Sequence, residues 1–282
     1  MDRPADPDTQ DLPPVPAASY YERLGPVAYT STAATQSPWQ LDLQHGGPPA
    51  ALLTREIEKS VADEPLVVGK VEVDFLGPIP QGRCAVAVDV LRPGRQVRQV
   101  QALMSFPEHG DRPVVAARAW LFSIEPGRAP ATTRATLVPP LPGPQPQRFF
   151  AGLDPSWGYG PSIEWRFSTG GFREVGAAQV WTRVRVPLVD DEPTSDLQRM
   201  LVVADSTNGI SAALPMDRWL SIPPALTVVV RRAPAGEWFM LDAQTSIEAQ
   251  GTGVAQSTIV DEQGICAHVL QPLLVAPLSP RG

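Results

Sequence analysis

Gln44-His45-Gly46-Gly47-Pro48-Pro49 leads directly into the apolar run Ala50-Ala51-Leu52-Leu53. Two adjacent glycines allow a close backbone approach, and proline suits the first turn of a helix, where its missing N–H costs nothing. The stretch predicts a helix whose free N-terminal N–H groups face a ligand. Such a helix end can bind an anion or polarise a carbonyl group, although a core helix that merely starts at glycine fits the same residues.

The helix predicted from this stretch covers residues 48–61, because Ala50, Leu53 and Ile57 share one face and the charged residues lie off it. Four long segments of strand character follow. They cover residues 67–75, 83–91, 97–106 and 114–124. One helix followed by four long antiparallel strands predicts a curved sheet wrapped around that helix.

The second half of the chain repeats this order. Gly82 precedes an alternating run over residues 84–90, Gly236 precedes a matching run over residues 238–243, and a second helix is predicted over residues 196–214. A period of roughly 150 residues indicates tandem domains rather than a solenoid. We therefore expect an α+β protein with two long antiparallel sheets, each wrapped around a central helix, joined edge to edge or face to face.

Proline marks the expected domain boundaries. The chain has 282 residues, of which 33 are proline, and they concentrate in two segments. Residues 1–18 are polar and lack apolar periodicity, which is typical of a disordered tail. Residues 125–158 are predicted to be a proline-rich linker. The first domain is then expected over residues 19–124 and the second over residues 159–282.

The composition argues against several classes of function. A net charge of −7 without a basic run argues against a nucleic-acid-binding surface. No segment approaches the roughly 20 apolar residues of a membrane span, and the N-terminus lacks a signal pattern, so we expect a cytoplasmic protein. Cys84 and Cys266 are then predicted to be buried thiols. The three histidines lack ligand spacing, so we expect no metal and no cofactor.

An aspartate stands at an unusual place in the second predicted helix. Residues 200–204 are apolar all round, as in a helix enclosed by a sheet, and Asp205 follows in helical register with Leu201 and Asn208. Burying a carboxylate is costly unless it is hydrogen-bonded or functional. Asp205 is therefore a candidate catalytic residue, and the alternative is an aspartate bonded locally to Ser206 and Thr207.

Together these features resemble the TesB-like acyl-CoA thioesterases, which have a double-hotdog fold. The resemblance covers roughly residues 20–275. It rests on His45-Gly46-Gly47 before the first helix, on residues 204–209 in the second, and on residues 226–232 followed by Gly236. The final predicted strand, residues 264–275, contains a glutamine as the closing strand of the family does.

In that family an aspartate, a threonine or serine, and a glutamine converge on the water that attacks the thioester. The resemblance assigns these roles to Asp205 and Gln271, whereas the hydroxyl position falls at Pro223. Thr227 lies on the same strand face as residue 223 if no bulge intervenes, so it is the candidate hydroxyl. His45, Gly46 and Gly47 are expected to bind substrate, with an N–H of Gly46 or Gly47 stabilising the oxyanion.

The resemblance implies hydrolysis of an acyl-CoA thioester to free fatty acid and CoA, with a water positioned by Asp205 and Gln271. One alternative is a catalytically weakened acyl-CoA-binding protein, because Pro223 has no hydroxyl. Another is an acyl-CoA hydratase or dehydratase, for which the absence of a histidine near Asp205 in sequence is unfavourable. The expected partners are the acyl-CoA substrate and further copies of the chain, because exposed sheet edges need cover.

Overall fold

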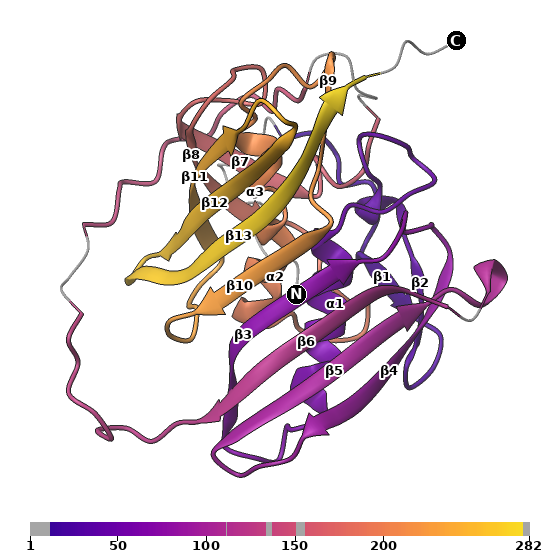
Figure 1. The fold of residues 1–282 in the computed structure, drawn as a ribbon, viewed down its shortest axis with the longest axis vertical. Coiled ribbons are helices and arrows are strands. Elements are labelled where there is room, and N and C mark those ends of the chain that lie inside the picture. The colour runs from indigo at the N-terminus through magenta and orange to yellow at the C-terminus, as the bar shows by residue number, and fades with distance from the viewer. Residues whose placement is uncertain (1–11, 111, 134–136, 151–155, 279–282) are drawn as a thin grey trace, which may run out of the picture.

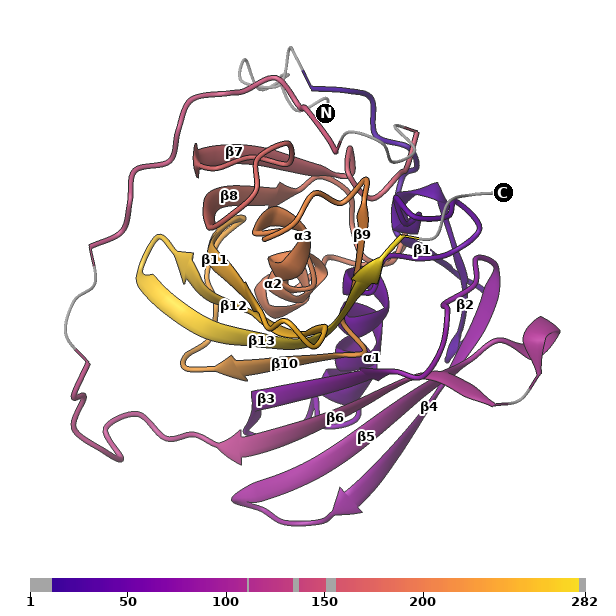
Figure 2. The same cartoon turned by 45° about the horizontal axis from the view of Figure 1, so that its top comes forward.

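The computed structural model describes residues 12–110, 112–133, 137–150 and 156–278. These residues form one curved sheet of 13 strands whose neighbours run antiparallel (Figure 1). Its strand order is β1-β2-β4-β5-β6-β3-β10-β13-β12-β11-β8-β7, and β9 pairs separately with β13. Figure 2 shows α2 and α3 enclosed by the second half of this sheet, with α1 on the inner side of the first half.

The first half of the chain contains one long helix and most of its strands in the predicted places. Its elements are β1 (Tyr21–Arg23), β2 (Ala28–Ser31), the 3₁₀ turn η2 (Ala33–Thr35), α1 (Gly47–Lys59), β3 (Leu66–Phe75), β4 (Arg83–Arg92), β5 (Val97–Ser105), η3 (Pro107–His109) and β6 (Pro113–Ser123). The apolar face of α1 is buried, including Leu53 and Ile57. The periodicity therefore predicted the helix but not how completely it is enclosed, because Arg55 and Glu56, which lie off the apolar face, are also buried.

The second half repeats the architecture. Its elements are β7 (Ile163–Thr169), β8 (Ala178–Val184), α2 (Asp196–Ala204), α3 (Thr207–Ile210), β9 (Trp219–Ile222), β10 (Ala225–Val230), β11 (Trp238–Ile247), β12 (Thr252–Asp261) and β13 (Gly264–Pro277). Gly82 before β4 and Gly236 before β11 both have positive φ, 111° and 89°, which glycine adopts without strain. The repeated glycines thus mark equivalent turns in the two halves.

The two halves join edge to edge through β3 and β10, where Val71 lies opposite Val228. This pairing makes one sheet and leaves both helices on its concave side (Figure 2). The start of α1 there meets the end of α2 at very short range. A Cβ on Gly47 would lie only 2.0 Å from the carbonyl oxygen of Val202, so glycine is required at this crossing.

The second helix is interrupted, which corrects the prediction of one helix over residues 196–214. Helix α2 ends at Ala204, and α3 covers only Thr207–Ile210. In a continuous helix the Val202 carbonyl would accept from the N–H of Ser206, but here it accepts from the Tyr159 hydroxyl at 2.8 Å. The Ser206 N–H bonds to Val203 instead, which tightens the chain into a turn at Asp205.

The region between β6 and β7 has neither helix nor strand among its described residues. It includes most of the predicted linker and runs around the outside of the second half (Figure 1). Most of the predicted N-terminal tail lies outside the described residues. Cys84 and Cys266 are buried free thiols, as predicted. Within the described ranges, no helix is both long and apolar enough to cross a membrane.

Candidate active site

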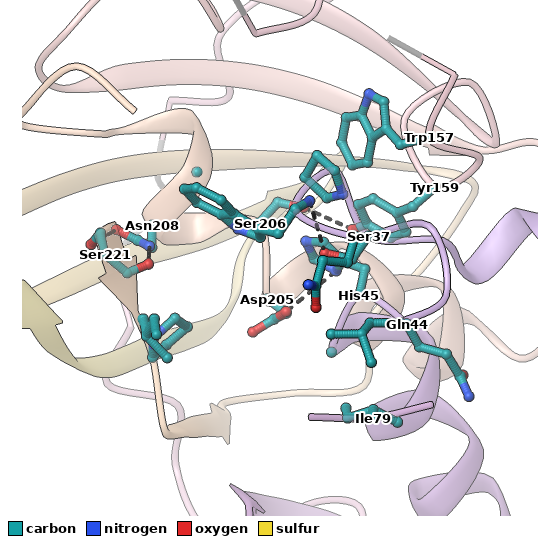
Figure 3. A pocket seen from close by; sticks show the side chains of 18 of the residues that line it. Ser37, Gln44, His45, Ile79, Trp157, Tyr159, Asp205, Ser206, Asn208 and Ser221 are labelled. Carbon is teal, nitrogen blue, oxygen red and sulfur yellow. Dashed lines mark hydrogen bonds and ion pairs between the residues drawn. The ribbon is translucent and has the colours of Figure 1, made fainter. Parts of the chain in front are cut away.

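A cavity of about 610 Å³ opens where α1 begins and α2 ends. Both halves of the chain contribute to its walls, which are mainly apolar. The aromatic residues that line it are Trp39, Phe75, Phe150, Trp157, Tyr159, Trp165 and Phe172. Figure 3 shows Asp205 and His45 side by side in this cavity, close to Ser206 and Tyr159. No lysine or arginine is among the described residues that line it.

Asp205 lies in the cavity wall at the end of α2, with 8% of its surface exposed. Its Oδ1 accepts a hydrogen bond from the Gln271 side-chain amide at 2.8 Å, and its Oδ2 lies 3.3 Å from Nδ1 of His45. Burial raises the pKa of Asp205 to about 7, although hydrogen bonds from the Gly46 backbone N–H and from Gln271 act in the opposite direction. The carboxyl group can therefore exchange a proton near neutral pH.

His45 immediately precedes α1 and stacks on Tyr159, with ring centroids 3.8 Å apart and planes inclined by 5°. Burial lowers the pKa of His45 to about 3, so the imidazole is neutral near pH 7 and its contact with Asp205 is not an ion pair. The Gly47 N–H donates to Nδ1 at 3.3 Å. When Nδ1 accepts, Nε2 carries the hydrogen of the neutral ring and is a potential donor.

The two predicted oxyanion donors are already engaged by protein groups. The Gly46 N–H interacts with Asp205, and the Gly47 N–H bonds to His45. The following Pro48 and Pro49 have no N–H to offer. The N-terminus of α1 is therefore directed at the Asp205 and His45 side chains, which differs from the predicted direct contact between its N–H groups and a substrate carbonyl.

Gln271 lies beneath Asp205 rather than in the cavity. It is fully buried on β13 and is absent from the cavity lining. Its amide oxygen accepts from the backbone N–H of Asn208 at 3.0 Å, while its amide nitrogen donates to Asp205. Because both ends of this amide have protein partners, the geometry suits a residue that fixes Asp205, in place of the predicted direct contact with water.

Thr227 does not reach the site, so the prediction of a hydroxyl from this residue is wrong. Ile222 and Thr227 are five residues apart, whereas their β13 partners Leu274 and Leu270 are four apart. The extra residue, at the two prolines between β9 and β10, reverses the alternation of side chains. Leu226 and Val228 consequently face the buried side, and Thr227 lies on the outer face with the exposed Leu270.

Other hydroxyl and amide groups occupy the region that Thr227 was expected to reach. Ser221 lines the cavity and donates to the Asn208 side-chain oxygen at 3.0 Å (Figure 3). Ser206 shares a 2.7 Å hydrogen bond with the hydroxyl of Tyr159. The helical register already placed Asn208 one turn after Asp205, but no sequence pattern pointed to Tyr159. Its role depends on stacking between residues more than a hundred positions apart.

Among the described residues, no group of three or more histidine, cysteine, aspartate or glutamate side chains could hold a metal ion. The polar groups that line the apolar cavity include a buried carboxyl group, a neutral imidazole and several hydroxyl and amide groups.

Comparison with known proteins identifies the family. Residues 35–122 match the acyl-CoA thioesterase N-terminal domain, and residues 133–275 match the acyl-CoA thioesterase C-terminal domain. No curated protein matches the sequence.

Several solved structures share the fold at low sequence identity. The tesB protein of Mycobacterium avium subspecies paratuberculosis is 16% identical, with a TM-score of 0.65 over 91% of this chain and 96% of that chain. Acyl-CoA thioesterase II of Mycobacterium marinum is 18% identical, with a TM-score of 0.62 over 92% and 96%. A hot dog fold protein of Alicyclobacillus acidocaldarius is 17% identical, with a TM-score of 0.66 over 93% and 97%.

The two domain matches cover most of the chain and follow in the order of its two halves. The protein therefore belongs to the acyl-CoA thioesterase family and has the double-hotdog fold.

Proposed function

We propose that the protein hydrolyses an acyl-CoA thioester to a free fatty acid and CoA, with Asp205 as the general base. The observation that carries this proposal is a buried carboxyl group, with a pKa raised to about 7, in the wall of an apolar cavity. A base is most effective when its pKa lies near the working pH. Membership of the acyl-CoA thioesterase family supports the choice of substrate.

The proposed reaction begins when Asp205 takes a proton from a water molecule in the cavity. The water oxygen attacks the carbonyl carbon of the thioester and forms a tetrahedral intermediate. The carbon–sulfur bond then breaks, and the proton held by Asp205 passes to the CoA thiolate. Gln271 acts as a positioning residue in this scheme, because its amide holds Oδ1 of Asp205 and leaves Oδ2 for the water.

His45 is the best candidate to stabilise the negative charge on the carbonyl oxygen. The Gly46 and Gly47 N–H groups are engaged, whereas the Nε2–H of His45 has no hydrogen-bond partner among the described residues. A neutral imidazole at a helix N-terminus is able to polarise a carbonyl group in this way. The parallel stack on Tyr159 fixes the plane of the ring and so the direction of that donor.

The cavity also limits the part of the substrate that it can hold. Its walls are aromatic and aliphatic, and no lysine or arginine among the described residues lines them. Such walls suit the uncharged acyl chain and the thioester. We therefore expect the phosphates of CoA to remain outside the cavity, where water can solvate them.

Release of free thiol from acyl-CoA substrates tests this proposal. Asp205→Asn should lower kcat by roughly two to four orders of magnitude, as removal of a general base does. The matched control is Asp242→Asn, the same substitution at an exposed position on β11. The control should keep the wild-type rate. Wild-type protein that releases no thiol from short, medium or long acyl-CoAs would refute the proposal.

A hydratase remains the second candidate, and one observation favours it. The sequence argument against it was the absence of a histidine near Asp205, but the fold brings Nδ1 of His45 to 3.3 Å from Oδ2 of Asp205. A histidine and an aspartate are thus paired in space. Incubation with an enoyl-CoA distinguishes the two activities, because hydration removes the conjugated double bond and leaves the thioester intact.

A weakened acyl-CoA-binding protein is the third candidate. Pro223 lines the cavity where the family resemblance predicts a hydroxyl. This candidate predicts tight acyl-CoA binding without thiol release, by wild type and by Asp205→Asn alike.

A further inference from the structure

The end of the predicted linker is fixed to the edge of the second sheet. β7 is the last strand in the sheet order, so one of its edges has no strand partner within the part of the chain that the structure describes. The Gln145 side chain accepts from the Phe167 N–H at 2.8 Å and donates to the Phe167 carbonyl at 2.9 Å. The Gln147 side chain makes the same pair of bonds to Trp165, at 3.1 Å each. Two side-chain amides thus occupy the positions that a neighbouring backbone would take.

We call residues 145–150 the edge segment. Gln145, Gln147 and Phe149 alternate along it, as side chains on one face of an extended chain do. Phe149 packs against Trp157 and Phe172, with ring centroids 5.5 and 5.7 Å away. The Arg173 side chain also donates to the Phe149 carbonyl at 3.0 Å. These contacts hold the backbone of the edge segment directly before Phe150.

Phe150 has a different environment from Phe149. It lines the cavity, whereas Phe149 does not. Its ring meets Phe172 edge to face at 4.7 Å and lies 6.0 Å from Trp157. The ring also lies close to Gly209. A Cβ atom built on Gly209 would be 3.4 Å from the Cζ of Phe150. Gly209 belongs to α3, the helix that follows Asp205 along the chain, so the Phe150 ring forms the part of the cavity wall next to α3.

We propose that Phe150 limits the size of the acyl group that the cavity accepts, and that Gln145 and Gln147 are positioning residues that hold it there. The inference rests on the proposed acyl-CoA function. The bound group is an uncharged, apolar acyl chain, because the described lining of the cavity carries no cationic side chain. The linker would then form part of the substrate site in addition to joining the two halves.

The physical basis is the volume that the Phe150 ring occupies. Replacing it with a methyl group leaves space that a longer acyl chain can fill, because the neighbouring Phe172 also packs on Trp165 and Phe167, and Gly209 is part of α3. Each methylene group accommodated in an apolar pocket changes selectivity by roughly tenfold or more. The short acyl chains that already fit gain nothing from the extra space.

Binding of non-hydrolysable S-alkyl-CoA thioethers tests this inference without requiring turnover. Dissociation constants for butyl, octyl, dodecyl and hexadecyl thioethers are measured by calorimetry for wild type, Phe150→Ala and Phe122→Ala. We expect Phe150→Ala to improve the affinity for the long thioethers relative to butyl by roughly tenfold or more. Phe122→Ala is the matched control: it removes the same ring from an exposed position on β6, outside both the cavity lining and the edge segment, and should keep the wild-type order.

The double variant Gln145→Ala/Gln147→Ala tests the positioning role. It should shift the length preference in the same direction as Phe150→Ala, although every residue of the cavity wall is unchanged. A merely structural role would lower the thermal midpoint and leave the ratio of dissociation constants as in wild type. Phe150→Leu provides a milder change of the same kind if Phe150→Ala does not fold.

The outcomes separate this inference from the proposed function. An unchanged length preference in Phe150→Ala or Phe150→Leu, with hydrolysis intact, overturns the inference alone. A shifted preference in a protein that never releases thiol overturns the proposed hydrolysis alone. Wild-type protein that binds none of the thioethers overturns both.

Discussion

Asp205→Asn should make the protein more stable than wild type at alkaline pH. Burial raises the pKa of Asp205 from 3.8 to about 7, so the native state keeps a proton that the unfolded chain has already lost. Stability falls with rising pH wherever the native state binds more protons than the unfolded state. The stabilisation that comes from the protonated form of Asp205 is therefore fully present below about pH 4 and is lost as the pH rises through about 7.

The magnitude follows from the shift in pKa. A change of roughly three pKa units, at 1.36 kcal/mol each, corresponds to roughly 4 kcal/mol between the two ends of this range. The introduced asparagine cannot ionise. Its oxygen can still accept from Gln271, and its amide is uncharged, like the protonated carboxyl group. The variant thus reproduces the protonated state of the site at every pH.

Urea unfolding at about pH 5 and about pH 8.5 measures this effect as a difference between wild type and variant, which cancels the other titrating groups. Because about two of the roughly three pKa units lie between about pH 5 and about pH 7, we expect the stability of the variant relative to wild type to increase by roughly 3 kcal/mol from the lower to the higher pH of the measurement. Asp242→Asn, at an exposed position, should show no such gain. A difference between wild type and Asp205→Asn that stays constant with pH would refute the reasoning, because it would mean that Asp205 is not a buried acid of raised pKa.

Three further substitutions test other parts of the site. Gln271→Leu removes a hydrogen bond worth about 1 kcal/mol, so kcat should fall by roughly five- to tenfold with little change in KM, and the pKa of Asp205 should rise further. Gly47→Ala places a Cβ 2.0 Å from the Val202 carbonyl, and forcing α1 and α2 apart should lower stability by roughly 1–3 kcal/mol in thermal unfolding. Pro223→Thr restores the hydroxyl of the family pattern and should raise thiol release if its loss weakens the native protein; an unchanged rate would show that this position no longer matters.

The sequence predicted those features that depend on local periodicity. The apolar stripe of α1 and the alternation of β3 to β6 identify these elements, because each pattern depends on neighbours a few residues away. The burial of Arg55 and Glu56 on α1 was not predicted, because it depends on distant partners such as Glu192, which pairs with Arg55. The break after α2 could not be predicted in this way. It depends on Tyr159, which is distant in sequence and donates a hydrogen bond from its hydroxyl to the Val202 carbonyl.

The site residues follow the same division. The burial of Asp205 was predictable because a carboxylate follows directly on a helix segment that is apolar all round. Thr227 was misplaced because one extra residue near Pro223 reverses a strand's faces, and alternation alone does not locate such a bulge. The pairing of His45 with Asp205 was missed because the two residues lie far apart in the sequence. They come together only where the start of α1 meets the end of α2 in the folded protein.

The pH dependence of kcat/KM for acyl-CoA hydrolysis tests the central claim most directly. The profile reports the pKa of the essential base in the free enzyme. If Asp205 is that base, kcat/KM should rise with pH through one ionisation near 7 and then level off, and Asp205→Asn should abolish both the rate and the rise. Hydrolysis that persists in Asp205→Asn with an unchanged profile would contradict the account and place the catalytic base elsewhere.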